Sequence, residues 1–228
     1  MKILRIIPVV FMVMLVGCNP DYVKVDLYTS DFSDSLEGKI INVPLEMKFS
    51  GHLGDEKDDV VQRIIQLSKK YLGADTEYTR SKGDFGDEVI IVKSQAPMGP
   101  SSSLKVFLTK RENSNLPLGL SIDRKEFSIK LVTTEALGRF NQELAAINFM
   151  LSIDMIPKTL TYNVVSDEKL RYQVVGYAAF VNEKPHLKFM QTLDRRESVA
   201  VDFSGGDGSI WKGDELRPSV SIIPESMK

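Results

Sequence analysis

Residues 41 to 49 alternate between apolar and polar side chains, and this pattern constrains the fold more than any other in the chain. The apolar positions are Ile41, Val43, Leu45, Met47 and Phe49. A period of two predicts a β-strand with one buried face, because successive side chains in a strand point to opposite faces. Pro44 falls on the polar face and lacks an amide donor, which predicts an edge strand or a bulge. An exposed edge at Pro44 is therefore a candidate partner-binding position.

Two helices and several shorter strands are predicted in the first two thirds of the chain. A helical period runs from 55 to 73, where acids crowd the N-terminus and lysines the C-terminus, as the helix dipole favours. A second helix is predicted over 134–146. Strands are predicted at 22–28, 76–80, 88–94, 104–110 and 117–123, and a loop at 29–39.

After residue 147 only strand patterns remain. They are predicted at 147–154, 159–165, 171–181, 186–191, 198–203 and 217–223. Short strands at regular spacing are typical of a β-sandwich. The predicted fold class is α+β, with an N-terminal mixed-sheet part carrying two helices at 21–146 and an immunoglobulin-like β-sandwich part at 147–228.

Residues 1–17 have the three regions of an export signal. Lys2 and Arg5 give a positive start, an apolar run follows from 6 to 16, and small residues lead to the cleavage point. The apolar run is shorter than the ~20 residues that a membrane-spanning helix needs. We therefore expect a cleaved signal peptide rather than a permanent span.

The end of this leader resembles the lipobox of bacterial lipoprotein precursors. The matching residues are Leu15, Val16, Gly17 and Cys18, of which Cys18 is the only cysteine in the chain. The resemblance implies that signal peptidase recognises the first three residues and that Cys18 carries diacylglyceryl and N-acyl chains. Residues 18–30 would then form a lipidated N-terminus and the first strand. Two or more acyl chains anchor a protein stably in a bilayer, whereas one does so marginally.

The residue after the cysteine bears on sorting. Lipoproteins of enteric bacteria with Asp at this position tend to stay at the inner membrane, and here the residue is Asn19. The resemblance therefore favours the outer membrane, facing the periplasm, over the inner membrane.

Charge and cysteine usage limit the partners. Loss of Lys2 and Arg5 with the leader, and of no acid, moves the formal charge from −2 to −4. A mildly acidic chain without a basic cluster argues against a nucleic-acid partner. With Cys18 acylated no thiol remains for a disulfide, so stability must come from apolar burial.

No catalytic constellation emerges, and we expect neither an enzyme nor a cofactor. His52 and His186 lack the closely spaced partners of a zinc site. Ser102 and Lys105 match S-x-x-K, but the companion motifs of acyl-transfer enzymes are missing and the segment is predicted as a strand. Asp84-Phe85-Gly86 lacks the other kinase motifs and is interpreted as a polar turn.

The loop at 204–215 is the most unusual stretch of the second half. Asp207, Asp214 and Glu215 form a weak candidate calcium site, since calcium favours several oxygen ligands on a flexible loop. The favoured alternative is a glycine-containing hairpin over which Trp211 packs. An exposed Trp211, the only tryptophan in the chain, would also suit partner binding.

The order of features also resembles an uncharacterised family of lipoproteins encoded by bacteriophages and prophages. The residues that carry the resemblance are V-K-V-D-L at 23–27, V-P-L-E at 43–46, V-G-Y-A-A-F-V-N at 175–182 and D-F-S at 202–204. It implies a role in altering the host envelope, for instance by binding a receptor from inside and excluding other phages.

The leading functional hypothesis is a non-enzymatic, membrane-anchored interaction module that binds another envelope protein. Exposed strand edges would offer one binding route, by addition of a partner's strand. A periplasmic hydrolase with an unrecognised carboxylate site is an alternative, and it requires a pocket with two acids of shifted pKa. A ligand- or metal-binding lipoprotein is the third hypothesis.

Overall fold

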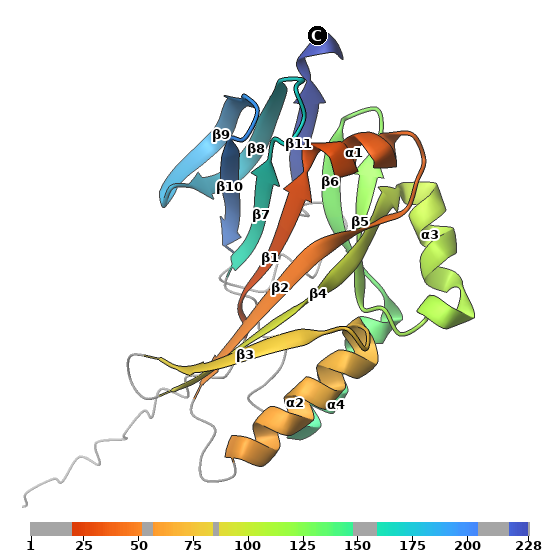
Figure 1. Cartoon of the computed structure of the whole chain (residues 1–228), viewed down its shortest axis with the longest axis vertical. Helices are drawn as coiled ribbons and strands as arrows, with labels where there is room; N and C mark the ends of the chain where they lie inside the picture. The colour runs from red at the N-terminus through yellow and green to blue at the C-terminus, as the bar shows by residue number, and fades with distance from the viewer. Residues whose placement is uncertain (1–19, 52–56, 84–86, 148–158, 205–218, 228) are drawn as a thin grey trace, which may run out of the picture.

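The computed structural model of the chain describes residues 20–51, 57–83, 87–147, 159–204 and 219–227. Strands predominate within these ranges (Figure 1). The strands are β1 (Pro20–Tyr28), β2 (Ile41–Gly51), β3 (Glu77–Lys82), β4 (Glu88–Pro100), β5 (Leu118–Asp123), β6 (Ser128–Thr133), β7 (Thr159–Val165), β8 (Tyr172–Val181), β9 (Lys184–Leu193), β10 (Ser198–Ser204) and β11 (Ser219–Pro224). The helices are α1 (Thr29–Leu36), α2 (Lys57–Leu72), α3 (Ser101–Thr109) and α4 (Glu135–Ile147), with short 3-10 helices at Arg111–Asn113 and Glu225–Met227.

Nine strands close into a ring. Their order is β10, β7, β1, β2, β4, β5, β6, β11 and β8, and β8 returns to β10 through the pair of Phe180 and Asp202. The other two strands extend the sheet beyond the ring, β3 beside β4 and β9 beside β8.

This closed, mostly β arrangement shows that the predicted α+β fold with a separate immunoglobulin-like sandwich is wrong. Strands from 147–228 do not pair only among themselves: β7 pairs with β1 in parallel, and β11 pairs with β6. Parallel partners are distant in sequence because they need a crossover connection. Strand spacing alone therefore could not identify them.

The prediction that Pro44 marks an edge strand is also wrong. β2 lies between β1 and β4 and pairs with β4 from Ile41 to Gly51, with Pro44 opposite Gln95. The pairing of β1 with β2 ends at Leu45. Pro44 lies next to Leu45, just outside the stretch of β2 that pairs with β1. Its missing N–H therefore removes no hydrogen bond to β1, and the ring tolerates proline in this interior strand.

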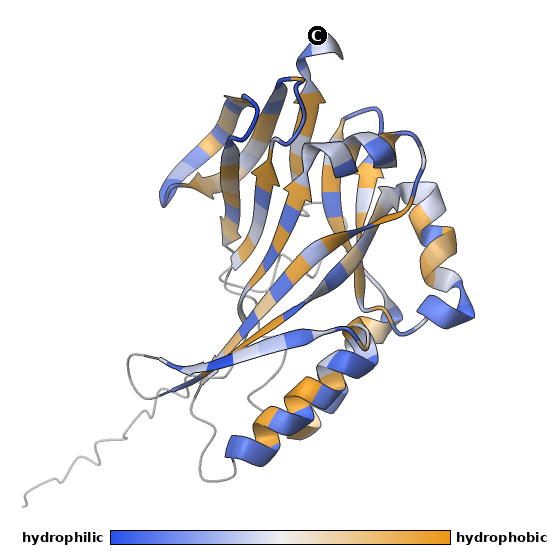
Figure 2. Ribbon diagram, in the orientation of Figure 1, coloured by the Kyte–Doolittle hydropathy of each residue, from blue (hydrophilic) through white to orange (hydrophobic). Residues whose placement is uncertain are grey.

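The core lies inside the ring, and the alternation of the strands supplies it (Figure 2). The buried face of β2 is the one that the sequence pattern predicted, from Val43 to Phe49. Two strands away from β2, the fully buried ring of Tyr162 on β7 packs edge-to-face on Phe203 of β10, with centroids 5.9 Å apart. Such a pair adds to the stabilisation from apolar burial.

The helices cover the sheet at two ends and one side (Figure 1). Helix α1 lies at the end that also holds the C-terminus and inserts fully buried Phe32 into the core. Helices α2 and α4 lie near the other end and pack on each other, where Tyr71 and Phe140 meet edge-to-face at 5.3 Å. Among the described helices, none is both long and apolar enough to cross a membrane.

Both predicted helices are confirmed, as α2 and α4. The predicted loop at 29–39 is wrong because Phe32 and Leu36, four residues apart, bury one face of α1. The predicted strand at 104–110 is also wrong: Leu104 and Leu108 share one face of α3. The strand predicted at 147–154 lies almost entirely outside the described residues.

Candidate functional site

Most of the residues singled out in the sequence lie outside the described part of the chain. These are Leu15, Val16, Gly17 and Cys18 of the leader, and Asp207, Trp211, Asp214 and Glu215 of the late loop. His52 lies outside it too. His186 is described, on β9, where its ring meets Phe189 edge-to-face at 5.7 Å. No group of three metal-ligating side chains occurs among the described residues.

The β8–β9 arm, residues 172–193, is the first of two surfaces with functional character. Among the described strands, β9 pairs only with β8, so its outer edge is open (Figure 1). A two-residue turn at Asn182 and Glu183 joins the strands, and both residues have positive φ. This geometry is typical of type I′ hairpin turns, which match the twist of the strands they join.

Apolar side chains face outward on this arm. Leu187 is 93% exposed, while Met190 and Tyr177 are each 57% exposed. The ammonium group of Lys188 lies 5.8 Å from the centre of the Tyr177 ring, a cation–π contact. Tyr177 pairs with Lys188, so Tyr177 and Met190 share one face of the arm, whereas Leu187 lies on the other face of β9. Exposed apolar side chains on both faces of an open edge strand favour a protein interaction surface.

The root of the same arm is rigid, in contrast to its surface. Phe189 is buried, and Leu193 and Val174 are fully buried in the core of the ring. The arm is therefore a fixed platform whose open edge and outward side chains are held in place before any partner arrives. Preorganisation of this kind lowers the entropic cost of binding.

The second surface is the α3–α4 hollow, a depression of about 660 Å³ between α3 and the start of α4. Its volume is within the range of small-molecule pockets. The apolar lining comes from Leu104, Leu108, Val132 and Ala136. The charged groups at its walls are Lys105, Glu135 and Arg139.

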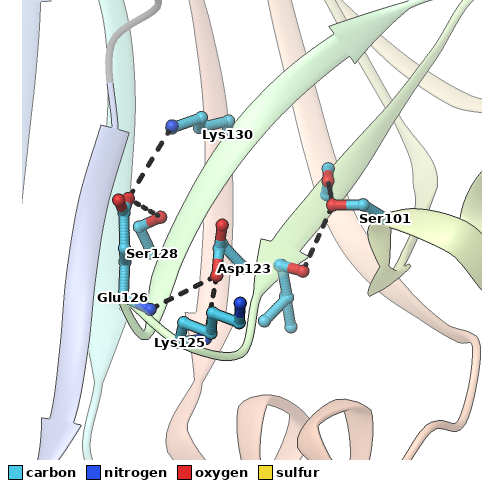
Figure 3. Close-up of polar contacts among 8 residues, drawn as sticks. Ser101, Asp123, Lys125, Glu126, Ser128 and Lys130 are labelled. Carbon is cyan, nitrogen blue, oxygen red and sulfur yellow. Dashed lines mark hydrogen bonds and ion pairs between the residues drawn. The ribbon is translucent and has the colours of Figure 1, made fainter.

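A hydroxyl pair closes one side of the hollow. The Oγ atoms of Ser101 on α3 and Ser121 on β5 are 2.5 Å apart (Figure 3). The nearby β5–β6 turn is fixed by Asp123, whose carboxylate accepts hydrogen bonds from the amides of Lys125 at 2.8 Å and Glu126 at 3.3 Å. Ser101 also donates to the carbonyl of Ile122 at 3.4 Å, and these contacts join α3 to β5.

The S-x-x-K match lies on a helix, α3, rather than on the predicted strand. Ser102 and Lys105 both lie on α3, yet they line different surfaces: Lys105 borders the α3–α4 hollow, and Ser102 borders a second depression beside Ile40. The side chain that shares the hollow with Lys105 is Ser101. The arrangement thus differs from the nucleophile and base of acyl-transfer enzymes, which must face one another.

The carboxyl groups with lowered pKa form ion pairs or hydrogen bonds. A hydrogen bond from Arg80 holds the pKa of buried Glu88 below its usual value, and one from Lys70 does the same for Glu143. Burial opposes ionisation of Asp167, but hydrogen bonds from Ser30 and Thr29 outweigh it and lower the pKa.

Among the described carboxyl groups, only Asp31 has a raised pKa. Burial, together with the charges of Asp167 and Asp34, raises the pKa of Asp31. Neither Asp31 nor Asp167 lines the α3–α4 hollow or the other described hollows, and none of these hollows brings together two acids with shifted pKa. The described hollows therefore do not meet the requirement of a paired-carboxylate hydrolase.

Sequence reasoning missed both surfaces. A strand was predicted at 186–191, within β9, but its position at an edge depends on pairing partners that no local pattern reveals. The α3–α4 hollow was missed because its α3 wall was predicted as a strand. A four-residue spacing of Leu104 and Leu108 was the available signal for a helix.

No model of a known protein family matches the chain, and a search of curated proteins found no similar sequence.

Proposed function

We propose that the protein is a phage- or prophage-encoded lipoprotein of the bacterial envelope that acts as a non-enzymatic interaction module. It binds a partner protein through the β8–β9 arm. The open edge of β9, with 93% exposed Leu187 at its surface, is the observation that carries the proposal. The anchor is Cys18, at the end of a lipobox-like leader.

The anchor and the fold are compatible in their spacing. β1 begins at Pro20, so only Asn19 separates it from Cys18. Two steps of 3.8 Å between successive Cα atoms span at most about 7.6 Å. An acylated Cys18 would hold the end of the ring where β1 begins close to the bilayer. The root of the arm, where Tyr172 pairs with Leu193 and Pro224, lies at the end of the molecule that holds the C-terminus (Figure 1), where an envelope protein can reach it.

The arm is suited to an extended partner segment that adds as a further strand. An open edge offers backbone donors and acceptors, which supply affinity, while side chains on alternate positions supply specificity. Lys184 and Lys188 on β9 add positive charge to a chain that is acidic overall. We therefore expect a partner strand that combines apolar residues, placed to meet Leu187 and Met190, with acidic residues.

Lysine and proline on an edge strand also prevent unspecific pairing. Pro185 and the two lysines lie on β9 beside Leu187. The combination favours a selective edge: Pro185 limits pairing near the turn, and the lysines disfavour strands that carry positive charge, including β9 of a second copy.

The test is crosslinking in intact cells followed by affinity purification of four chains: wild type, Cys18→Ser, Leu187→Asp and Val106→Asp. Val106 is the matched control, because it is 64% exposed but lies on α3, away from the arm. We expect a discrete partner with wild type and Val106→Asp, and its loss with Leu187→Asp and Cys18→Ser.

Two results would contradict the proposal. Recovery of the same partner with Leu187→Asp at wild-type yield would exclude the arm as the docking surface. An undiminished membrane fraction and an unchanged partner with Cys18→Ser would exclude the lipid anchor.

A further inference from the structure

We infer that the α3–α4 hollow is a binding site for a small amphipathic anion, a molecule with one carboxylate or phosphate group and a single apolar chain. The hollow is built from α3, β5, β6 and α4 and shares no residue with the β8–β9 arm. The inference is therefore independent of the proposed partner interaction and of the lipid anchor.

The floor of the hollow selects an apolar body. Leu104 and Ala136 are each 1% exposed and belong to its lining, and Leu108 and Val132 complete the apolar surface. A pocket of this size that is predominantly apolar, with a few polar groups at its edge, is typical of sites for small organic ligands. Water in contact with such a floor is displaced favourably by an aliphatic chain.

The walls select a negative head group. Lys105 and Arg139 give two positive charges against the single negative charge of Glu135, in a chain whose formal charge is −2. Among the residues that the structure describes, Lys105 forms no ion pair and no hydrogen bond through its ammonium group. A bound anion would supply that partner, and charge-assisted hydrogen bonds are the strongest of those available here.

Arg139 is already oriented toward this role. Its Nη2 atom donates a 2.8 Å hydrogen bond to the carbonyl oxygen of Ser114, another residue of the lining. This bond fixes the side chain at the wall of the hollow. The guanidinium group has five N–H donors in total, so donors remain for an oxyanion.

The hydroxyl groups divide into committed and available ones. Thr134 donates to the carbonyl of Leu116 at 2.6 Å and accepts from the amide of Ala136 at 3.1 Å, so it caps α4. Thr109 donates to the carbonyl of Val106 at 2.9 Å. Ser101 and Ser121 are committed as well, because Ser101 also donates to the carbonyl of Ile122 at 3.4 Å and Ser121 then donates to Ser101. Thr133 of the lining makes no hydrogen bond through its hydroxyl group to another described residue, so its donor remains for a ligand oxygen.

The test is calorimetric titration of the mature chain, residues 18–228, carrying Cys18→Ser, so that neither the apolar leader nor an acyl chain requires a competing detergent. The probes are octanoate and octyl phosphate, with butyrate and octylamine as matched controls for chain length and charge. We expect both octyl anions to bind, butyrate to bind at least about tenfold more weakly, and octylamine not to bind. The stronger of the two octyl anions identifies the head group.

The variants locate the binding. Lys105→Met should weaken octanoate binding by about tenfold or more, because a neutral side chain of similar length replaces the free cation. Lys110→Met is the matched control, at the end of the same helix but beside the other depression. Amide NMR shifts on adding octanoate should be largest around Leu104, Leu108 and Ala136.

Three outcomes would overturn the inference. They are absence of binding by both octyl anions at millimolar concentration, equal binding of octylamine, and octanoate binding that Lys105→Met and Lys110→Met leave equally strong. If a lysine variant folds poorly, titration of the four probes against the chain with Lys105 and Lys110 intact still tests the inference.

Discussion

The amide N–H of Leu131 on β6 donates a 3.0 Å hydrogen bond to the hydroxyl oxygen of Tyr162 on β7, across the interior of the ring. β6 and β7 are not neighbours in the sheet; four strands separate them on one side and three on the other. The bond therefore joins opposite walls of the closed sheet. It also links a strand of the first 146 residues to a strand of the last 82, the two segments that the sequence suggested as separate parts.

Tyr162→Phe tests this bond. The substitution keeps the ring and its contact with Phe203 but leaves the buried N–H of Leu131 without that partner. We expect the free energy of unfolding to fall by about 1–3 kcal/mol, as measured by urea denaturation. Tyr177→Phe, at an exposed position, should change it by less than about 0.5 kcal/mol. Equal effects of the two variants would contradict the importance of the bond.

The turn of the arm predicts a stabilising substitution. Glu183 has φ of 63°, a left-handed conformation that glycine adopts without strain. Glu183→Gly should raise the free energy of unfolding by about 1 kcal/mol, since a left-handed residue with a Cβ costs about that much. Glu183→Ala is the control and should give no such gain. A destabilised glycine variant would indicate a different turn.

The ion pair of Glu88 and Arg80 predicts a pH dependence. The pKa of Glu88 is lowered in the folded state by the hydrogen bond from Arg80. A carboxyl group whose pKa is lower in the folded state than in the unfolded state stabilises the folded protein. This stabilisation is fully present above the pKa of the unfolded state, about 4.3, and is lost as the pH falls through the pKa of the folded state.

Denaturation at several pH values checks this contribution. The stability difference between wild type and Glu88→Gln should be largest above about pH 5 and should shrink below about pH 4. Glu77→Gln, on the exposed strand β3, serves as the control. A difference that grows toward low pH would have the wrong sign and would contradict the assignment.

Leu187→Asp should leave the fold intact. A side chain that is 93% exposed contributes little apolar burial, so we expect a change in the free energy of unfolding below about 0.5 kcal/mol. Phe189→Ala, two residues along β9 but buried, should cost about 3–5 kcal/mol. If Leu187→Asp unfolded the protein, loss of a partner would say nothing about docking.

The local parts of the fold could be predicted from the sequence, and the long-range parts could not. Helix α2 and strand β2 follow from periodicity because one face of each is buried on the core. The closure of the ring depends on pairs such as Phe180 with Asp202 and Val23 with Leu160, which no local pattern encodes. Short α1 was missed because its Ser- and Asp-rich sequence is also typical of loops, and α3 was missed because its apolar residues at 104–108 were interpreted as a strand.

The candidate surfaces were less predictable still. The strands predicted at 171–181 and 186–191 leave room for a short turn at Asn182, but the exposure of Leu187 depends on β9 having a single neighbour among the described strands. The α3–α4 hollow joins residues more than 30 positions apart, such as Lys105 and Arg139, whose proximity follows only from the assembled sheet. For Pro44 the error was the opposite one. Its missing N–H suggested an edge strand, but β2 pairs with a strand on each side.

Photocrosslinking in living cells tests most directly whether the arm docks a partner of a lipid-anchored protein. A photoreactive benzoylphenylalanine replaces Leu187 in one chain and Val106 in a second, each with Cys18 either intact or changed to Ser. The proposed function predicts a discrete adduct from position 187 when Cys18 is intact, a weaker one or none with Cys18→Ser, and none from position 106. No adduct from position 187, or the same adducts from both positions, would contradict it.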